Sequence, residues 1–275
     1  MMSPASGAAN WWTSYLDRFH EDHPGITEDV LSQACDVDGM NPYAWLLAAA
    51  PRRPGVLALD LACGSGPLQL AGSHLRWIGV DRSPGELARA GRAEGVLVRG
   101  DGQRQPFRDA AFDLVACSMA LMLFDPVDAV LTEIDRVLRD EGRLILLLPG
   151  SVPLSTRDRV RYLRMLSCLR KVRPVYPNRV HLGRLHARLA RAGLNVVSDQ
   201  RRCFLYPIRD DHDAERFAES LYAPGVSPQR LDRTLRVARS WVGSTLGIPL
   251  RRVVCDKTAQ STRRHDNAAG PSSAR

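Results

Sequence analysis

The sequence predicts an α/β protein with a doubly wound, mostly parallel sheet. From about residue 56, short apolar runs alternate with segments of helical periodicity, the pattern of strands joined by helical crossovers. The run Leu144–Leu148 is apolar throughout, as expected for a parallel strand that is buried on both faces. Of the 275 residues, 44% are hydrophobic and 25% are charged, which is ordinary for a globular protein with a core.

The segment before the sheet predicts helices. We expect residues 1–10 to be disordered, and helices at Trp11–Ala34 and Pro42–Ala50. The aromatic side chains of Trp11, Tyr15 and Phe19 are four residues apart and share one face of the first helix. The breaker-rich residues 51–55 then form a linker to the sheet.

Seven apolar runs predict strands. Helix signals lie between them: Ser83–Glu86 forms a capping box, and Gly142 is expected to end a helix that Asp125 and Pro126 begin. The predicted strands are Val56–Leu61, Arg76–Val80, Gly95–Arg99, Phe112–Cys117, Leu144–Leu148, Asn195–Tyr206 and Pro249–Cys255.

Beyond Pro149 the alternation changes to a helix-rich insertion among the last strands. Helices are expected at Arg157–Arg173, Leu182–Ala192, Asp211–Tyr222 and Pro228–Leu246. Residues 257–275 are small, polar and basic and predict a flexible tail.

The composition limits the cellular compartments and the binding partners that we expect for this protein. No apolar run reaches the roughly 18–20 residues that span a membrane, and the N-terminus lacks the pattern of a signal peptide. Six scattered cysteines without a Cys-x-x-Cys pair favour free thiols in a reducing cytoplasm over disulfides or a metal site. The net charge of +8 makes a nucleic-acid partner a minor alternative to a solvated surface or an acidic small substrate. No feature indicates an oligomeric state.

The segment Asp60–Gly66 is the strongest functional signal. An apolar strand ends in an acid, and a loop of small residues leads into a helix, so the backbone can approach a ligand closely. A dinucleotide fingerprint requires a third glycine, but Gln69 stands at that position. Asp60 would also repel a pyrophosphate. The loop therefore favours a ligand that has a positive end and no phosphates.

Four further landmarks follow this loop in order, and together they resemble class I S-adenosylmethionine-dependent methyltransferases. The type most similar is the ubiquinone/menaquinone-biosynthesis-like subgroup, methyltransferase type 11. The matching segments are Asp60–Gly66, Gly79–Asp81, Gly100–Phe107, Ala111–Val115 and Leu131–Pro149. The resemblance covers about residues 55–150 and implies a Rossmann-like, seven-stranded sheet.

The resemblance implies a set of cofactor-binding residues. Gly64 and Gly66 would bracket the methionine part of S-adenosylmethionine, and Asp60 would help to hold its ammonium group. Asp81 would accept both ribose hydroxyls, and Asp101 would accept from the adenine amino group. The full set is Asp60, Ala62, Gly64, Gly66, Asp81, Arg82, Asp101, Gly102 and Ser118. No metal is implied.

Two departures from the family pattern affect this set. Ala62 stands in the first glycine position of the loop. Asp60 and Asp81 are also closer in sequence than is usual, so the helix after Gly66 must be brief. Arg82 is expected along the adenine, the Gly102 N–H near it, and Ser118 facing the methionine moiety.

We also expect a division of the chain into parts, of which the first rests on the aromatic face of the N-terminal helix and not on the resemblance. Residues 1–50 form a helical lid, and residues 51–256 form the methyltransferase domain, with substrate-side helices at about 155–192 and 211–246. His181 and His186 are candidate bases in that region.

The predicted reaction is methyl transfer to a hydroxyl, carbon or amine of a small metabolite. Three alternatives remain open: an RNA or protein methyltransferase, a non-catalytic protein with a cofactor fold, and an NAD-dependent enzyme.

Overall fold

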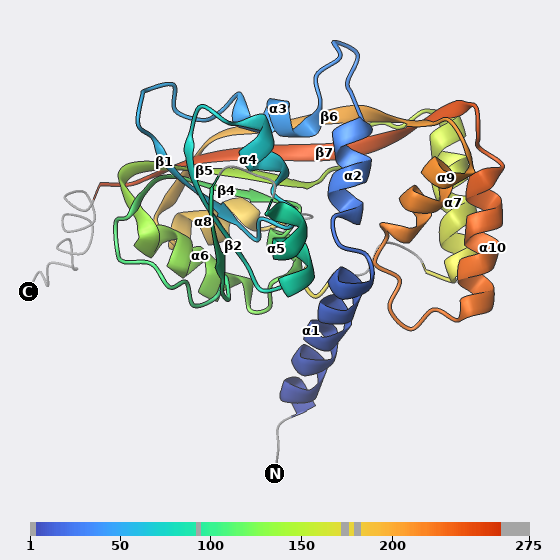
Figure 1. Ribbon diagram of the computed structural model, residues 1–275, viewed down its shortest axis with the longest axis horizontal. Coiled ribbons are helices and arrows are strands. Elements are labelled where there is room, and N and C mark those ends of the chain that lie inside the picture. Colours follow the sequence, from blue (N-terminus) through green and yellow to red (C-terminus); the bar gives the residue numbers. More distant parts are fainter. Residues whose placement is uncertain (1–3, 92–94, 172–175, 179–182, 260–275) are drawn as a thin grey trace, which may run out of the picture.

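A single seven-stranded sheet forms the centre of the protein (Figure 1). The computed structural model describes residues 4–91, 95–171, 176–178 and 183–259. The strand order is β3-β2-β1-β4-β5-β7-β6, and β7 runs antiparallel to both of its neighbours. The strands are β1 Leu57–Leu61, β2 Arg76–Asp81, β3 Val96–Arg99, β4 Phe112–Ser118, β5 Leu138–Pro149, β6 Leu194–Ile208 and β7 Ser244–Lys257. The predicted fold class is confirmed.

The order of the strands reverses beside β1. The chain moves outward from β1 through β2 to β3, and then returns to place β4 on the other side of β1. Both pairs are parallel, so the carboxyl ends of β1, β2 and β4 lie at the same edge of the sheet. Ligands of open α/β sheets bind at such a switch point.

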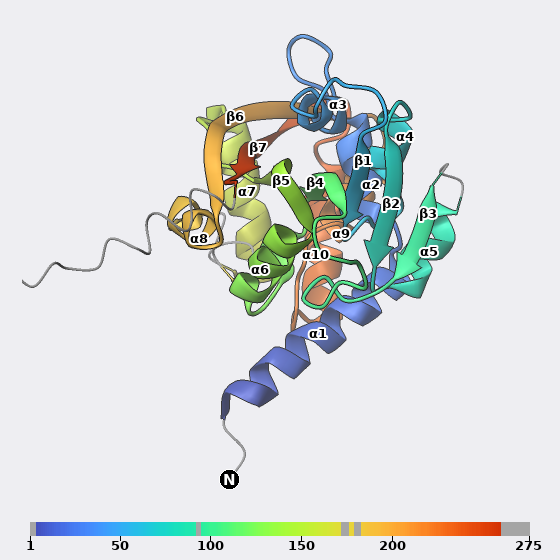
Figure 2. The same cartoon turned by 90° about the vertical axis from the view of Figure 1, so that its left-hand side faces the viewer.

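Helices cover both faces of the sheet, as Figure 2 shows. One core packs α2, α3 and α4 against the sheet, and a second core packs α6 and α8 against the opposite face. The helices are α1 Pro4–Asp22, α2 Ile26–Gln33, α3 Pro42–Leu47, α4 Pro67–Ala71, α5 Pro84–Ala90, α6 Val127–Val137, α7 Thr156–Leu169, α8 Leu185–Arg191, α9 Asp211–Glu219 and α10 Pro228–Arg239, with a 3-10 turn at Leu121–Leu123. Within the described residues, no helix is both long and apolar enough to cross a bilayer.

The long strands β6 and β7 carry a separate group of helices. In Figure 1, α7, α9 and α10 cluster at one end of these strands, and the first half of α1 projects away from the body. The side chain of Arg161 on α7 turns inward, where it donates to Thr245 O at 2.8 Å. At least one arginine of the helix predicted at Arg157–Arg173 therefore holds this group of helices together.

The N-terminal helices differ from the prediction. The helix α1 begins at Pro4, so the expectation of disorder over residues 1–10 is wrong for the part that the structure describes. Proline is favoured at a helix start, and the alanines that follow it propagate a helix well. The expected helix Trp11–Ala34 is divided at Pro24 and Gly25, because Gly25 adopts φ 73° and turns the chain.

Three predicted boundaries in the second half are also wrong. Gly142 lies inside β5, at an irregularity where the pairing with β4 shifts between Leu138 and Arg143. The helix α10 ends at Arg239, and Leu246 belongs to β7. Lys257 is part of β7, and its buried Nζ donates to the carbonyls of Asp135 and Leu138, so the flexible tail does not begin there. The rest of the predicted tail, from residue 260, lies outside the described residues.

Candidate active site

A cavity of about 520 Å³ opens at the carboxyl ends of β1, β2 and β4, between the sheet and the N-terminal helices. Side chains from α1, α2 and the segment after α9 close its other side. The predicted cofactor residues that line this cavity are Ala62, Gly64, Asp81, Arg82, Asp101 and Ser118. The structure therefore brings residues from separate motifs to one space.

The loop after β1 has a left-handed backbone at three alternate residues. Ala62 has φ 55°, Gly64 has φ 51°, and Gly66 has φ 79° at the start of the short helix α4. The Gly64 N–H donates to Asp81 Oδ2 at 2.9 Å. A Cβ at Gly64 would overlap Glu28 Oε1, so any other residue there would have to displace the Glu28 side chain.

The Asp81 carboxylate ends β2 and stands at the cavity wall. Its second oxygen accepts the Ser83 N–H at 2.8 Å. Burial raises the pKa of Asp81, while the hydrogen bonds from Ser83 and Gly64 act in the opposite direction. Both oxygens thus have a fixed orientation beside the loop that carries Gly64.

Three of the predicted cofactor residues do not line the cavity. Asp60 is 1% exposed behind the loop, and its Oδ2 has no hydrogen-bond partner among the described residues. Burial, then the charge of Asp81, raises its pKa well above the usual value. Gly66 begins α4, and Gly102 lies under the ring of Phe124, where a Cβ would be 2.8 Å from the ring.

The remaining predicted residues, Asp101, Arg82 and Ser118, line the cavity. Asp101 is exposed, and its Oδ1 accepts the Gln103 N–H at 2.9 Å. Arg82 Nε lies 3.0 Å from Asp17 Oδ1, so this arginine ties the end of β2 to α1. Ser118 is the last residue of β4.

Of the two histidines predicted as bases, the structure describes His186 alone, and it lies away from the cavity. His186 is 54% exposed on α8 and pairs with Asp199 on β6 at 2.7 Å. It does not line the cavity, because α8 packs against β6 and α6 rather than over the loops of the switch point. His181 lies outside the described residues.

His20 is the histidine that lines the cavity. Its Nδ1 lies 2.8 Å from Glu86 Oε1, and its Nε2 lies 3.2 Å from the Tyr222 hydroxyl. The sequence predicted Glu86 as part of the capping box of α5, but it did not indicate the contact with His20. Ser83 Oγ does accept the Glu86 N–H, but the Glu86 carboxylate accepts from His20 and from the Gly25 N–H.

Glu28 on α2 is a second residue that the sequence did not indicate. Its carboxylate faces Gly64 and lies near Glu86. Burial, and then the negative charge of Glu86, raises the pKa of Glu28 to about 7. Together with Asp81 and the buried Asp60, these residues gather carboxyl groups at the end of the cavity beside the Gly64 loop.

Aromatic side chains form the opposite wall. The Tyr222 ring lies 4.7 Å from Phe19 and 6.3 Å from Tyr176 between ring centroids. Trp12 is 6% exposed, and its Nε1 has no hydrogen-bond partner among the described residues. A flat or apolar molecule could therefore pack against these rings, and the Trp12 Nε1–H is a donor without a partner among the described residues.

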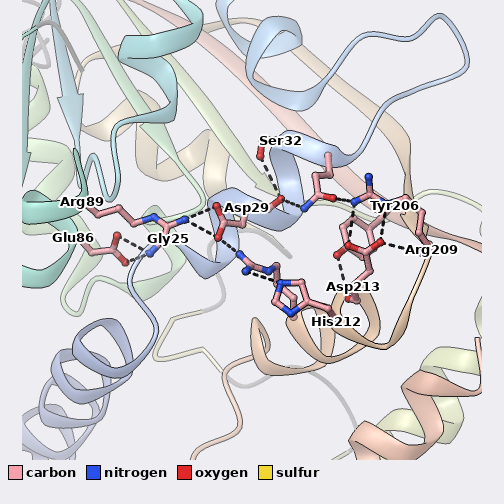
Figure 3. A network of polar contacts seen from close by, with 11 residues as sticks. Gly25, Asp29, Ser32, Glu86, Arg89, Tyr206, Arg209, His212 and Asp213 are labelled. Atoms are coloured by element: carbon pink, nitrogen blue, oxygen red, sulfur yellow. Dashed lines mark hydrogen bonds and ion pairs between the residues drawn. The ribbon is translucent and has the colours of Figure 1, made fainter. Parts of the chain in front are cut away.

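A polar network holds α2 in position (Figure 3). Asp29 on α2 accepts from Arg89 on α5 at 2.7 Å and pairs with Arg216 on α9. The Gly25 N–H donates to both oxygens of Glu86. These contacts fix Glu28, one residue before Asp29, relative to the cavity.

The family described as "Methyltransferase domain" matches residues 59–146. This span holds the loop after β1 and the ends of β2 and β4, which form one wall of the cavity. Residues 59–146 belong to this methyltransferase family. The predicted recognition is confirmed.

Curated relatives match less than half of this chain. The demethylmenaquinone methyltransferase of Beutenbergia cavernae is 38% identical over 127 residues, which cover 44% of this chain and 50% of the relative. The nocamycin O-methyltransferase of Saccharothrix syringae is 35% identical over 134 residues, which cover 44% and 47%. The chain thus spans about half the length of the curated relatives it matches.

Solved structures share the fold over a longer part of the chain. The YcgJ protein from Bacillus subtilis superposes with a TM-score of 0.52 at 19% identity, covering 78% of this chain and 97% of that structure. The [4+2]-cyclase SpnF superposes with a TM-score of 0.52 at 16% identity, covering 79% and 80%. At these identities the likeness shows the fold alone.

The cavity draws on residues inside and outside the methyltransferase domain. Asp81 and Glu86 lie within residues 59–146, whereas His20, Glu28 and Tyr222 lie outside them. The side of the cavity that would meet an acceptor is therefore built by the flanking segments.

Proposed function

We propose that this chain transfers the methyl group of S-adenosylmethionine to a small-molecule acceptor. The observation that carries the proposal is the cavity itself, where the motif residues Gly64, Asp81 and Asp101 meet a wall built by the N-terminal helices. The residues present fit the cofactor. A glycine without room for a Cβ, an acidic methionine end and an unpartnered oxygen of Asp60 all suit a cationic amino-acid ligand.

Each part of the cofactor has candidate partners. Gly64 and Ala62 would lie along the methionine part, and Glu28 would hold its ammonium group, with Asp60 behind the loop. Asp81 would accept both ribose hydroxyls. Asp101 would accept from the adenine, with Arg82 alongside. The left-handed backbone of the loop and the fixed carboxylate of Asp81 support this assignment.

The cofactor supplies an activated methyl group on a sulfonium, so the protein has to position the reactants and exclude water. The N-terminal helices suit the second task, because Trp11, Trp12 and Leu16 line the cavity from α1. We therefore assign residues 1–50 the role of a lid, and we assign the aromatic wall to the acceptor.

The acceptor is a small organic molecule in this proposal. The relatives are named for demethylmenaquinone and for nocamycin, one of them as an O-methyltransferase. A hydroxyl or a carbon is thus preferred over an amine. The aromatic wall and the enclosed cavity disfavour an RNA or protein substrate, and a reducing cytoplasm suits the six free thiols.

The direct test is calorimetric titration of the purified chain with S-adenosylmethionine and its demethylated product. We expect binding of both, and Asp81→Asn should weaken it at least about tenfold, since a hydrogen bond to a charged group contributes about 1.5–3 kcal/mol. Asp109→Asn is the matched control, because this acid is 80% exposed and pairs only with Arg136 among the described residues. Absence of binding by the intact chain would contradict the proposal.

A further inference from the structure

His20 and Glu86 form a hydrogen-bonded pair at the boundary between the cofactor side and the aromatic side of the cavity. We propose that His20 is the general base of the reaction, that Glu86 positions it, and that the acceptor carries an ionisable hydroxyl group. The inference rests on the proposed function. It assigns a residue and an acceptor class that the motif residues do not determine.

The contacts of the imidazole fix its tautomer. An ionised carboxylate only accepts, so Nδ1 carries the proton that it donates to Glu86 Oε1 at 2.8 Å. Nε2 then holds the lone pair, and the Tyr222 hydroxyl at 3.2 Å donates to it. Nε2 has a single lone pair, so a bound hydroxyl would replace Tyr222 as the donor to this nitrogen. A base oriented by a third group is the usual arrangement for activating a nucleophile.

Glu86 is fixed by more than this one contact. It is 1% exposed and receives the Gly25 N–H on both oxygens, at 2.9 and 3.1 Å. Gly85 beside it leaves room for α1, because a Cβ there would be 3.3 Å from the His20 carbonyl oxygen. Backbone packing between α1 and α5 therefore determines where the imidazole points.

The groups that face His20 favour its protonated form. They are Glu86 on α5, Glu28 on α2, Asp81 at the end of β2, and the phenol of Tyr222. Burial lowers the pKa of His20, but the hydrogen bond and charge of Glu86, followed by Glu28 and Asp81, raise it above 6.5 overall. Tyr222 stays neutral, because burial raises its pKa well above 10. Glu28 also has a pKa near neutrality, so it is the contact of His20 Nε2 with the Tyr222 phenol that singles out His20 as the group placed to take a proton from a hydroxyl on the aromatic side.

The step balances with the acceptor as the only added reactant. The acceptor oxygen forms a bond to the methyl carbon while the carbon–sulfur bond breaks, and the sulfur keeps the electron pair. His20 Nε2 takes the hydroxyl proton, and Glu86 stabilises the imidazolium. The proton then passes to water after the product leaves.

Two naphthols of different acidity test this assignment in the full chain. With methyl-labelled S-adenosylmethionine, we expect turnover of 1-naphthol, and His20→Gln should lower its kcat by about 10²–10⁴-fold. The more acidic 4-nitro-1-naphthol needs less help in losing its proton, so its kcat should fall far less. Calorimetry should give an unchanged Kd for S-adenosylmethionine in the variant. His23→Gln, just beyond the end of α1 and outside the cavity, should behave as wild type.

The variant Glu86→Gln tests whether Glu86 acts by positioning His20 or only by stabilising the fold. We expect the NMR-measured pKa of His20 to fall in this variant, and the acidic limb of the kcat profile to move to lower pH with it. Equal loss of both naphthols in His20→Gln, or no loss, would overturn the proposal. A wild-type chain that binds S-adenosylmethionine but neither binds nor methylates 1-naphthol would also overturn it. A chain that does not bind S-adenosylmethionine contradicts the proposed function instead.

Discussion

At the scale of single residues, the loop after β1 shows how backbone conformation selects side chains. Ala62 and Gly64 both have a positive φ, but a Cβ is tolerated only at residue 62. At residue 64 the space that a Cβ needs is taken by the Glu28 carboxylate. The family's first glycine position can therefore hold alanine at the cost of strain, whereas alanine at the second would also have to displace the Glu28 carboxylate.

Matched substitutions test this distinction. A left-handed conformation costs a non-glycine residue about 1–2 kcal/mol, and a glycine loses about 0.5–1 kcal/mol more on folding than alanine does. Ala62→Gly should therefore change the free energy of unfolding by less than about 1 kcal/mol, toward stability. Gly64→Ala should lower that free energy by about 1–2 kcal/mol and weaken cofactor binding at least tenfold, because Glu28 must move. Urea unfolding and calorimetry measure both. Wild-type binding by Gly64→Ala would contradict the account.

The carboxyl of Glu28 predicts a pH dependence of stability. Its pKa is about 7 in the folded chain against 4.5 for an ordinary glutamate. Between these values the unfolded chain has lost a proton that the folded chain keeps. The free energy of unfolding should therefore fall as the pH rises from about 4.5 to about 7 and then level off.

Glu28→Gln should remove this dependence. Without ligand at pH 8, we expect the variant to be more stable than wild type by about 3 kcal/mol, yet to bind S-adenosylmethionine at least about tenfold more weakly. Urea unfolding across the pH range and calorimetry give the two readouts. Glu219→Gln, an exposed position on α9, is the control. Equal pH profiles for Glu28→Gln and wild type would exclude this role.

At the scale of elements, α2 is a short helix held at both sides by arginines. Asp29 joins Arg89 of α5 to Arg216 of α9 (Figure 3). An eight-residue helix is marginal by itself, so these contacts and the packing of its buried face determine its position. Because Glu28 is on the same helix, the network also orients a cavity residue.

Asp29→Asn should loosen that helix. We expect a loss of about 1–2 kcal/mol in the free energy of unfolding, since two charge-assisted contacts are weakened at once. Affinity for S-adenosylmethionine should fall with it. Asp232→Asn breaks the exposed pair with Arg236 and should cost less than about 0.5 kcal/mol. The interpretation fails if the two variants have the same stability and affinity.

At the scale of the whole molecule, the cavity joins segments that are distant in the chain. His20 contacts Glu86 across 66 positions and Tyr222 across 202 positions. Ligand binding should therefore tighten the N-terminal helices and the segment around Tyr222 together.

Hydrogen exchange with and without S-adenosylmethionine measures this coupling. We expect new protection in α1, α2 and residues 220–223, and little change in α6 and α8 on the opposite face. At a hundredfold excess over Kd, the stabilisation should be about 2.7 kcal/mol and the Tm should rise by about 5–10 °C. Protection confined to the loops after β1 and β2 would show that the N-terminal helices do not close over the ligand.

The sequence by itself determined the fold class and the order of the cofactor motifs. Side-chain periodicity indicates burial locally, so most strands were predicted to within a few residues. The exceptions are the starts of β5 and β7, because Gly142 and Leu246 were assigned to the ends of helices. Only the tertiary structure decided which side chains share the cavity. His20, Glu28 and Tyr222 carry no local pattern, because packing between α1, α2, α5 and the segment after α9 brings them together. His186 was predicted as a base from its residue type and its region of the sequence. The helix α8 instead places it beside Asp199 on β6.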